Sequence, residues 1–335
     1  MKTVLYLLFF AAVLASAAGA QVFEIVPYPM TDNITGIQFL NTNTGFAVTS
    51  EGHFARTVNG AKSWVVDNIP PGVPLEDLSF INRDTGLLCG RGGTIYRTID
   101  AGATWENRTL KDTMPWILSI RLLEHQVALA VGMTREASKP LTGVVWRSTD
   151  GGMHWDAQPS MGLGYGELFV EPGKRVCFQS FGKLNCSTDE GRVWTSEKTV
   201  EGKPGRATAF FGKTGVIVGN NGMCAYSNDG GKTWATVTAD DNVHFTSVVL
   251  ASEKLGYMAG TGGAMFRTDD GGKSWQKVML PASFDVHAMC LIGRTLYAAG
   301  SGGHMVRATV GAPTSTTPTK TTPTKNTGAQ KKTRP

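Results

Sequence analysis

Short apolar segments bounded by glycine recur along the whole chain. Five of them read as strands that are apolar on both faces, at 86–90, 127–132, 215–219, 256–260 and 295–300. Another apolar segment precedes them, for example Leu78–Ile81 or Thr208–Phe211, and a glycine turn with a further strand follows. Short runs of this kind are typical of buried strands, and no stretch shows the periodicity of an amphipathic helix. The pattern predicts an all-β protein with almost no helix.

A polar phrase that ends in tryptophan follows these strands. The clearest copies are Ser227–Trp234 and Thr268–Trp275, whereas Thr57–Trp64 is degenerate, with Asn59 and Ala61 in place of Asp and Gly. The tryptophans stand at positions 64, 105, 155, 194, 234 and 275, in steps of 41, 50, 39, 40 and 41 residues. A fixed period near 40 residues indicates a repeat architecture.

We interpret these phrases as structural. An Asp at the start of a tight turn accepts hydrogen bonds from backbone N–H groups, and the Gly after it permits a positive φ. The Trp is expected to pack between neighbouring sheets, where an aromatic ring buries a large area. The residues given these roles are Asp100, Trp105, Asp150, Trp155, Asp189, Trp194, Asp229, Trp234, Asp270 and Trp275. Their spacing lacks the oxygen ligands of a calcium loop, so we expect neither a metal nor a cofactor.

Four short strands in each period of about 40 residues predict the blade of a β-propeller. The strand before the phrase occurs seven times, so we expect seven blades, each a four-stranded antiparallel sheet. The seventh unit stops near Val310 without a fourth strand, and Val22–Val26 has no other sheet to join. Pairing these two edges removes both of them. We therefore predict that this N-terminal strand closes the ring in blade seven.

The two ends of the chain differ from the repeats. Residues 1–20 contain Lys2, an apolar core and an Ala-Gly-Ala cleavage site, which predicts a secretory signal peptide. No apolar run is long enough for a membrane-spanning helix. Residues 312–335 are rich in Thr, Pro and Lys, so we expect a disordered basic tail. The propeller then occupies 21–311 in a protein exported to the periplasm, the thylakoid lumen or the extracellular space.

The charge balance does not favour nucleic acid as a partner. The chain has 32 Lys and Arg and 27 Asp and Glu, so its net charge is 32 − 27 = +5. The tail holds five cationic residues and no acid, at positions 320, 325, 331, 332 and 334. The basic excess therefore belongs to the tail, and the predicted propeller has no global bias toward nucleic acid.

Two of the five cysteines flank a predicted hairpin turn. Cys177 and Cys186 lie on either side of residues 181–182, so they are expected to face each other across adjacent strands. If the pair is not hydrogen-bonded, the sulfur atoms are close enough for a disulfide. The alternative is two small packed thiols. Cys89, Cys224 and Cys290 lie in apolar strands and read as core residues.

The repeated phrase resembles the Asp-box (BNR) motif. Within that group, the string from Gly90 to Trp105 is most similar to the photosystem II assembly and stability factor family. The resemblance covers residues 22–310 and implies a single seven-bladed propeller that is exported and is not an enzyme. It also implies a protein partner, which in a photosynthetic host would be an assembly intermediate of a membrane protein.

The alternative is a carbohydrate-binding or sialidase-like glycoside hydrolase propeller. A sialidase resemblance would require an Arg-Ile-Pro phrase, which the sequence lacks, and three arginines around one carboxylate. The recurring arginines at positions 56, 97, 147, 267 and 307 occupy equivalent points of different blades, so they cannot converge. Asp77 and Glu167 face the predicted channel, but their separation in the ring is expected to exceed that of a catalytic pair. The sequence also has no nucleophile elbow and no zinc-protease motif.

We expect a partner to bind the face opposite the Asp-box turns, in a monomeric protein. The candidate residues are Asp77, Arg91, Trp116, Glu167, Lys183, Arg206, His244, His287 and His304. The longest repeat step places an insertion at residues 133–142 on the same rim, and insertions on a rigid scaffold often carry function. Trp116 lies outside the repeat pattern, as an exposed anchor or as a plug of the channel.

Overall fold

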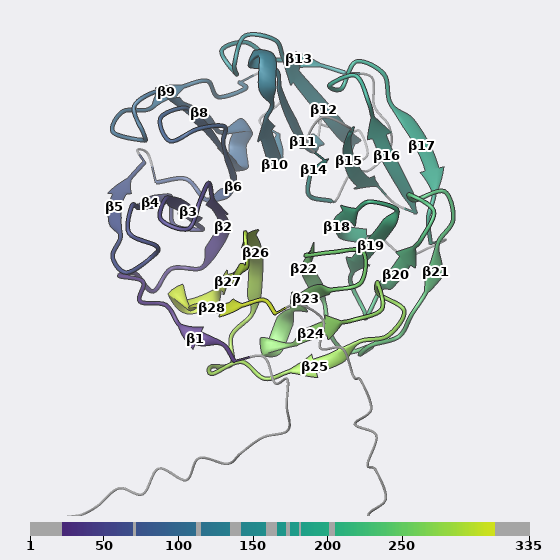
Figure 1. Ribbon diagram of the computed structural model, residues 1–335. Coiled ribbons are helices and arrows are strands. Elements are labelled where there is room, and N and C mark those ends of the chain that lie inside the picture. The colour runs from purple at the N-terminus through teal and green to yellow at the C-terminus, as the bar shows by residue number, and fades with distance from the viewer. Residues whose placement is uncertain are drawn as a thin grey trace, which may run out of the picture.

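The computed structural model describes residues 22–69, 72–111, 115–134, 142–158, 166–171, 175–180, 182–200 and 205–311. Its strands form seven four-stranded antiparallel sheets around a central axis (Figure 1). The prediction of an all-β, seven-bladed propeller is confirmed. The helices in these ranges are single 3₁₀ turns, too short to cross a bilayer: η1 (Arg91–Gly93), η2 (Glu124–Gln126), η3 (Thr261–Gly263) and η4 (Ser301–Gly303).

In blades 1 to 6 the strands run outward from the axis in chain order. Blade 1 has β2 (Ile34–Phe39), β3 (Gly45–Thr49), β4 (His53–Thr57) and β5 (Val65–Asn68), and blade 2 has β6 (Leu75–Phe80), β7 (Gly86–Gly90), β8 (Ile95–Thr98) and β9 (Glu106–Asn107). Blade 3 has β10 (Trp116–Leu122), β11 (Ala128–Thr134), β12 (Thr142–Ser148) and β13 (Asp156–Ala157). Blade 4 has β14 (Phe169–Glu171), β15 (Arg175–Ser180), β16 (Lys183–Ser187) and β17 (Thr195–Lys198).

The last three blades complete the ring. Blade 5 has β18 (Gly205–Phe211), β19 (Thr214–Gly219), β20 (Cys224–Ser227) and β21 (Ala235–Thr236). Blade 6 has β22 (Phe245–Leu250), β23 (Gly256–Gly260), β24 (Met265–Thr268) and β25 (Gln276–Val278). Blade 7 has β26 (Val286–Ile292), β27 (Thr295–Gly300), β28 (Met305–Thr309) and, as its outer strand, β1 (Glu24–Ile25).

The N-terminal strand closes the ring as predicted. Glu24 pairs with Arg307 and Ile25 with Val306, next to β28 in Figure 1. The strand is shorter than the predicted 22–26, although the Val26 N–H still donates to the Met305 carbonyl at 2.8 Å. Pro27, which follows, has no N–H with which to continue the pairing. An ion pair of 2.5 Å between Glu24 Oε1 and Arg307 Nε adds to the closure.

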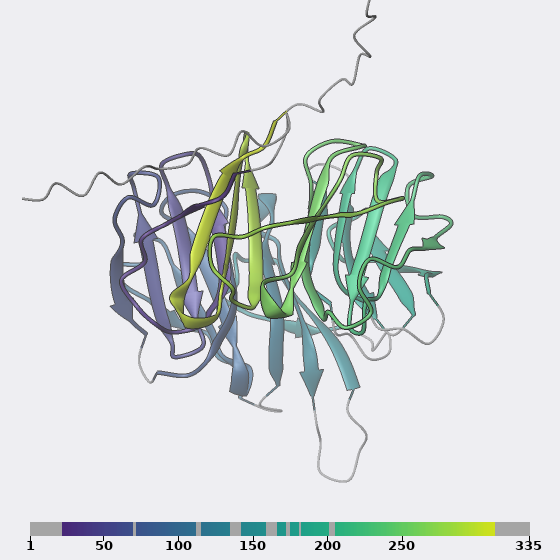
Figure 2. The ribbon, with the colours of Figure 1, turned by 90° about the horizontal axis from the view of Figure 1, so that it is seen from below.

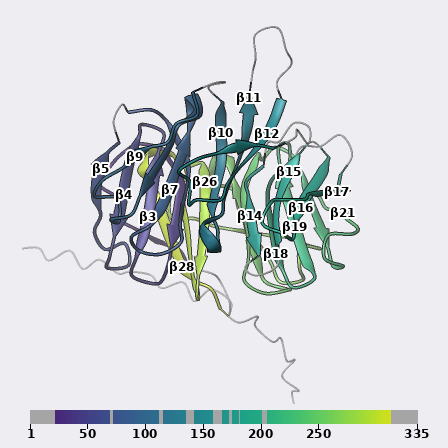
Figure 3. The ribbon, with the colours of Figure 1, turned by 90° about the horizontal axis from the view of Figure 1, so that it is seen from above.

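Loops gather on two opposite faces of the ring, which Figures 2 and 3 show edge-on. One face carries the turns η1, η3 and η4 and the segments that lead into the inner strands, and we call it the mouth face. The other carries the five Asp-box turns, at 100–104, 150–154, 189–193, 229–233 and 270–274, and we call it the Asp-turn face. The two sets separate because successive strands of a blade are antiparallel.

Each Asp-box turn is closed by its own side chains. In blade 6, Asp270 Oδ1 accepts hydrogen bonds from the Ser274 N–H (2.9 Å) and the Thr268 hydroxyl (2.8 Å). Asp270 Oδ2 accepts the Ser274 hydroxyl at 2.6 Å. The indole of Trp275 donates to the Gly272 carbonyl at 3.1 Å. Trp155, Trp194 and Trp234 repeat this last bond, whereas the buried indole nitrogens of Trp64 and Trp105 have no partner within the described ranges.

Arginines join the Asp-box turns to the preceding blades. Arg97 of blade 2 donates to the Gly151 carbonyl of the blade 3 turn at 3.0 Å. Equivalent bonds of 2.9 to 3.0 Å run from Arg56 to Ala101, from Arg147 to Glu190 and from Arg307 to Gly60. Arg267 has no such turn to reach, because blade 7 lacks an Asp-box, and it pairs with its neighbour Asp269 instead. These contacts account for the recurring arginines that the sequence shows at equivalent points.

Blade 4 departs from this scheme. Cys186 occupies the place of the recurring arginine, and Arg175 of β15 takes over the contact by donating to the Gly230 carbonyl at 2.9 Å. Its guanidinium also lies over the Phe210 ring, 4.1 Å from the centroid. Cys186 is directly opposite Cys177, with a Cα–Cα distance of 4.2 Å, and a disulfide joins the two. Cys89 and Cys224 are buried free thiols.

The core lies in the seams between adjacent blades. At the seam of blades 1 and 2, the rings of Phe46 and Phe80 stack with centroids 3.8 Å apart. Trp105 meets Phe54 edge-on at 5.0 Å in the same cluster. Each further Asp-box Trp packs in the same way against a cluster shared by its own blade and the preceding one.

A pair of glycine substitutions tests how tightly the seams are packed. Gly102→Ala is expected to lower the free energy of unfolding by about 3 kcal/mol, because a Cβ there collides with the Phe54 ring and φ is +81°. Gly230→Ala is the control, since φ is also +81° but nothing lies within 4 Å. Its expected cost is about 1 kcal/mol. If both variants lose the same free energy of unfolding in urea, the close packing of Gly102 against Phe54 does not contribute to stability.

The Asp-box carboxylates predict a loss of stability in acid. Burial alone would raise the pKa of Asp270, but hydrogen bonds from Ser274 and Thr268 lower it below its ordinary value. A lowered folded-state pKa stabilises the fold above the unfolded value of about 3.9, and the contribution is lost as pH falls below it. Asp270→Asn should therefore lose stability at pH 7, by about 1 kcal/mol. The difference in melting temperature between Asp270→Asn and wild type should decrease from pH 5 to pH 3. A difference that stays constant over this range would contradict a stabilising role of the ionised carboxylate.

Candidate functional site

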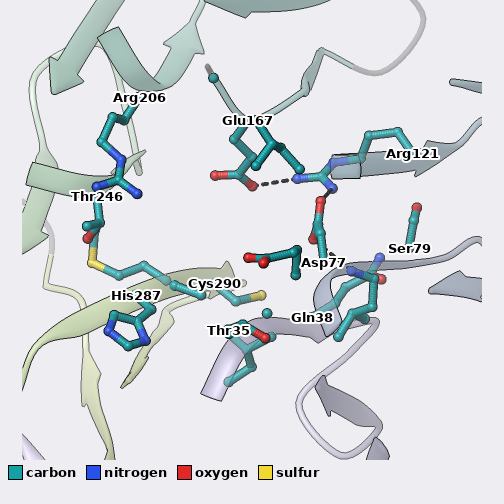
Figure 4. A pocket seen from close by; sticks show the side chains of 18 of the residues that line it. Thr35, Gln38, Asp77, Ser79, Arg121, Glu167, Arg206, Thr246, His287 and Cys290 are labelled. Atoms are coloured by element: carbon teal, nitrogen blue, oxygen red, sulfur yellow. Dashed lines mark hydrogen bonds and ion pairs between the residues drawn. The ribbon is translucent and has the colours of Figure 1, made fainter. Parts of the chain in front are cut away.

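A cavity of about 530 Å³ occupies the channel at the mouth face. The residues around it come from all seven blades, and Figure 4 shows their side chains pointing inward. Six of the nine predicted partner-binding residues line it: Asp77, Arg91, Trp116, Glu167, Arg206 and His287. The channel is therefore the place where the sequence-predicted residues come together.

A β-bulge shapes this cavity. In six blades the register between the inner strand and its neighbour shifts at one residue, and a bulge of this kind re-aims a side chain. The bulged residues are Thr35, Glu76, Leu118, Arg206, Thr246 and His287. All six line the cavity. The sequence pointed to Arg206 and His287, but it gave no sign of the bulge and so missed the other four.

Arg121 joins two acidic residues in the middle of the channel. Its Nη1 lies 2.5 Å from Asp77 Oδ2, and its Nη2 lies 2.5 Å from Glu167 Oε1. The Ser119 hydroxyl donates to the same Asp77 oxygen at 2.6 Å, and the Leu78 N–H donates to the other at 2.8 Å. The sequence did not predict this bridge, in which an arginine of the intervening blade reaches both Asp77 and Glu167.

Burial and charge oppose each other in this cluster. Burial would lower the pKa of Arg121, but the fields of Asp77 and Glu167 raise it above its ordinary value. Loss of solvation raises the pKa of Glu167 against the attraction of Arg121. The pKa of Glu167 is raised although 48% of its side chain is exposed, because that exposed part faces the channel and not bulk water. Arg121 was missed because it lies within a strand, where a charged residue usually faces solvent.

A second cluster lies at the rim. Trp116 is 37% exposed, and its indole donates to Glu76 Oε1 at 2.9 Å. The Arg91 guanidinium lies 4.4 Å from the centroid of the Trp116 ring and pairs with the same Glu76 oxygen at 3.2 Å. These two contacts fix the Trp116 ring at the edge of the channel and leave part of it open to solvent.

The other three predicted residues do not reach the channel cavity. His244 is exposed beside the blade 5 turn, and its Nδ1 lies 3.2 Å from the Asn221 N–H. His304 stacks on Phe284 with centroids 5.4 Å apart, and Lys183 is exposed at the start of β16. Each belongs to the outer part of the mouth face. The core of the predicted insertion, residues 135–141, lies outside the described ranges.

The channel continues toward the Asp-turn face. A second cavity of about 450 Å³ is lined largely by hydrophobic side chains, among them Phe80, Leu122, Phe169, Phe210, Leu250 and Leu291. Arg121, Glu167 and Cys290 border both cavities. Cys290 Sγ accepts a hydrogen bond from the Phe39 N–H at 3.3 Å, and burial raises the pKa of its thiol to about 11.

The channel carboxylates Asp77 and Glu167 are both paired with Arg121. Within the described ranges, no three His, Cys, Asp or Glu side chains form a group that could hold a metal ion. The site is a cavity lined by charged and polar side chains, which we call the funnel, with the partly exposed indole of Trp116 at its rim.

Comparison with known proteins identifies the family. The sequence profile described as "Photosynthesis system II assembly factor YCF48" matches residues 15–168 and 207–287, more than half of the chain. The chain belongs to this family. The resemblance drawn from the Asp-box phrases is thereby confirmed. No protein of curated function matches the sequence.

Solved structures agree with the YCF48 family in fold. "YCF48 bound to D1 peptide" is 18% identical, with a TM-score of 0.70 over 86% of this chain and 97% of that chain. "YCF48 from Cyanidioschyzon merolae" is 17% identical, with a TM-score of 0.67 over 86% and 98%. The propeller of "Structure of U3-55K" superposes with a TM-score of 0.68 at 9% identity, over 87% and 100%. At these identities the likeness establishes the fold alone.

Removing the central arginine of this YCF48-family chain tests the channel cluster. Arg121→Met is expected to cost about 3 kcal/mol of unfolding free energy in urea, because Asp77 and Glu167 lose their shared partner. Adding Glu167→Gln should restore part of the loss. Arg91→Met is the control: its side chain is 57% exposed, so its ion pair is expected to contribute about 1 kcal/mol or less. Similar costs for both arginines would contradict a central role for Arg121.

Proposed function

We propose that this chain is an exported, non-enzymatic assembly factor whose propeller binds a protein partner at the mouth face. Residues 1–20 act as a cleaved signal peptide, 21–311 form the binding domain and 312–335 a disordered basic tail. Membership of the YCF48 assembly-factor family supports binding of a protein as the function. The partner in a photosynthetic host is a photosystem II subunit during assembly.

The observation that carries this proposal is the rim cluster of Trp116, Arg91 and Glu76. Tryptophan and arginine dominate the energetics of protein interfaces, particularly where a fixed ring borders a pocket. The hydrogen bond to Glu76 and the stacked Arg91 hold the Trp116 ring in place, so little conformational entropy is lost on binding. The adjoining cavity, with a volume of about 530 Å³, is large enough to receive a side chain.

The chemistry of the partner follows from a similar protein. Because the solved structure of similar fold is "YCF48 bound to D1 peptide", a peptide segment of D1 is the first ligand to examine. Glycan binding is the alternative function, and a sialidase-like hydrolysis the more remote one. The engagement of Asp77 and Glu167 by Arg121 favours the protein partner over hydrolysis.

Truncating the rim tryptophan tests the proposal. Trp116→Ala should weaken binding to its peptide, selected from a set tiling D1, by roughly thirtyfold, about 2 kcal/mol, in isothermal titration. The same variant should lose the partner in pull-downs from host membranes. Its melting temperature should stay close to wild type, because the ring is partly exposed.

A matched truncation on the other face provides the control. Phe211 is 47% exposed at the end of β18, toward the Asp-turn face, so Phe211→Ala should bind the peptide as wild type does. Retention of polysaccharide, with no D1 peptide bound and no membrane protein captured, would replace the assembly role by the glycan-binding alternative. An equal loss in both variants would move the site away from the rim.

A further inference from the structure

The bulged residues around the channel are divided by charge. On blades 2 to 4 the cavity is lined by the acids Glu76, Asp77 and Glu167 and by the arginines Arg91 and Arg121, so acids outnumber cations by three to two on this side. On blades 5 to 7 the bulged residues are Arg206, Thr246 and His287, which Figure 4 shows on one side of the cavity. The channel mouth therefore has an acidic arc and a basic arc.

The two arcs differ in how their charges are satisfied. The acids are paired, Asp77 and Glu167 with Arg121 and Glu76 with Arg91. The Arg206 guanidinium has no hydrogen bond or ion pair with any residue that the structure describes, although its backbone carbonyl accepts the Glu167 N–H at 2.9 Å. That backbone bond fixes the strand from which the side chain extends. Arg206 is thus a positioned but unpaired cation in a cavity.

We propose that Arg206 and His287 form a subsite for a carboxylate side chain of the bound protein partner. The inference rests on the proposed function and assigns the chemistry of the group that enters the funnel. A guanidinium binds a carboxylate through two parallel N–H bonds, and a partly desolvated site strengthens them. Thr246 lies between the two groups in ring order, but its hydroxyl already donates to the Val286 carbonyl at 2.5 Å, so the subsite consists of Arg206 and His287.

The electrostatics of Arg206 and His287 favours an anionic ligand on this side of the cavity. Burial lowers the pKa of Arg206, with Glu76 as the opposing charge. Burial also lowers the pKa of His287, and Arg206 adds to the effect. The groups acting the other way on His287 are the Ile34 carbonyl, Asp285 and Glu76. A bound carboxylate would offset the repulsion between Arg206 and His287.

The acidic arc limits the charge of the ligand. Glu76 and Glu167 line the same cavity, and Glu167 already has a raised pKa because it is poorly solvated. Both carboxylates repel a doubly charged phosphate about twice as strongly as a singly charged carboxylate at the same distance. The geometry favours a partner's Asp or Glu over inorganic phosphate.

The test uses the whole mature chain and small probes. The imidazole signals of His287, assigned with a His287→Gln variant among the six histidines, are followed by NMR during titration with N-acetyl-glutamate amide. Saturable shifts are expected, together with a rise in the pKa of His287. N-acetyl-glutamine amide, which has the same shape but no charge, should produce neither.

Variants and a second anion complete the test. Arg206→Gln should weaken binding of the glutamate probe at least tenfold, whereas Arg83→Gln, at an exposed arginine of the β6–β7 loop on the Asp-turn face, should leave it unchanged. Unchanged melting temperatures show that both variants fold. Equal binding by Arg206→Gln, no shift at any probe concentration, or tighter binding of inorganic phosphate than of the glutamate probe would each overturn the carboxylate subsite.

The two proposals fail in different ways. If Arg206→Gln captures the protein partner as strongly as wild type, the subsite is wrong and the assembly function stands. If the glutamate probe binds at His287 but no protein is captured by the wild-type chain, the subsite stands and the proposed function is wrong.

Discussion

The contact between one blade and the next is the interaction on which the whole structure depends. A four-stranded sheet of this size cannot bury both of its faces alone, so each blade is stable only between two neighbours. Two sets of polar bonds fix the seam. At the Asp-turn face an arginine reaches the carbonyl of the neighbouring turn. Near the axis an inner-strand side chain accepts an N–H from the next inner strand, as Ser79 does from Leu122 and Gln38 from Phe80. The Asp-box therefore presents a carbonyl to its neighbour as well as closing a turn.

The sequence predicted the architecture well because the repeat consists of residue types that few other folds could accommodate at these positions. Gly and Asp at a turn, Trp at the seam and short apolar strands are each hard to satisfy in another fold. The boundaries of 86–90, 256–260 and 295–300 agree with the strands β7, β23 and β27. The ring closure could also be predicted, because the seventh unit lacked a fourth strand and Val22–Val26 had no other sheet to join.

The site was predicted only in part, for physical reasons. Residues in segments leading into inner strands were identified from the topology, and five of them line the cavity, together with Arg91 of the β7–β8 turn. The β-bulges leave no trace in composition, so Thr35 and Thr246 gave no signal. Arg121 sits on a strand whose neighbours are apolar, and only the fold brings Asp77 and Glu167 to either side of it. Long-range charge pairing of this kind depends on coordinates that a spacing rule does not contain.

The seam between β1 and β28 joins residues more than 280 positions apart, as the bond between Glu24 and Arg307 illustrates. The first strand of the propeller to be synthesised is thus among the last to find its partner. Contacts of such high sequence separation form late and slowly. Until blade 7 exists, blade 1 presents an open flank. Pairing of β1 with β28 is then the step that completes the ring and commits the chain to its folded form.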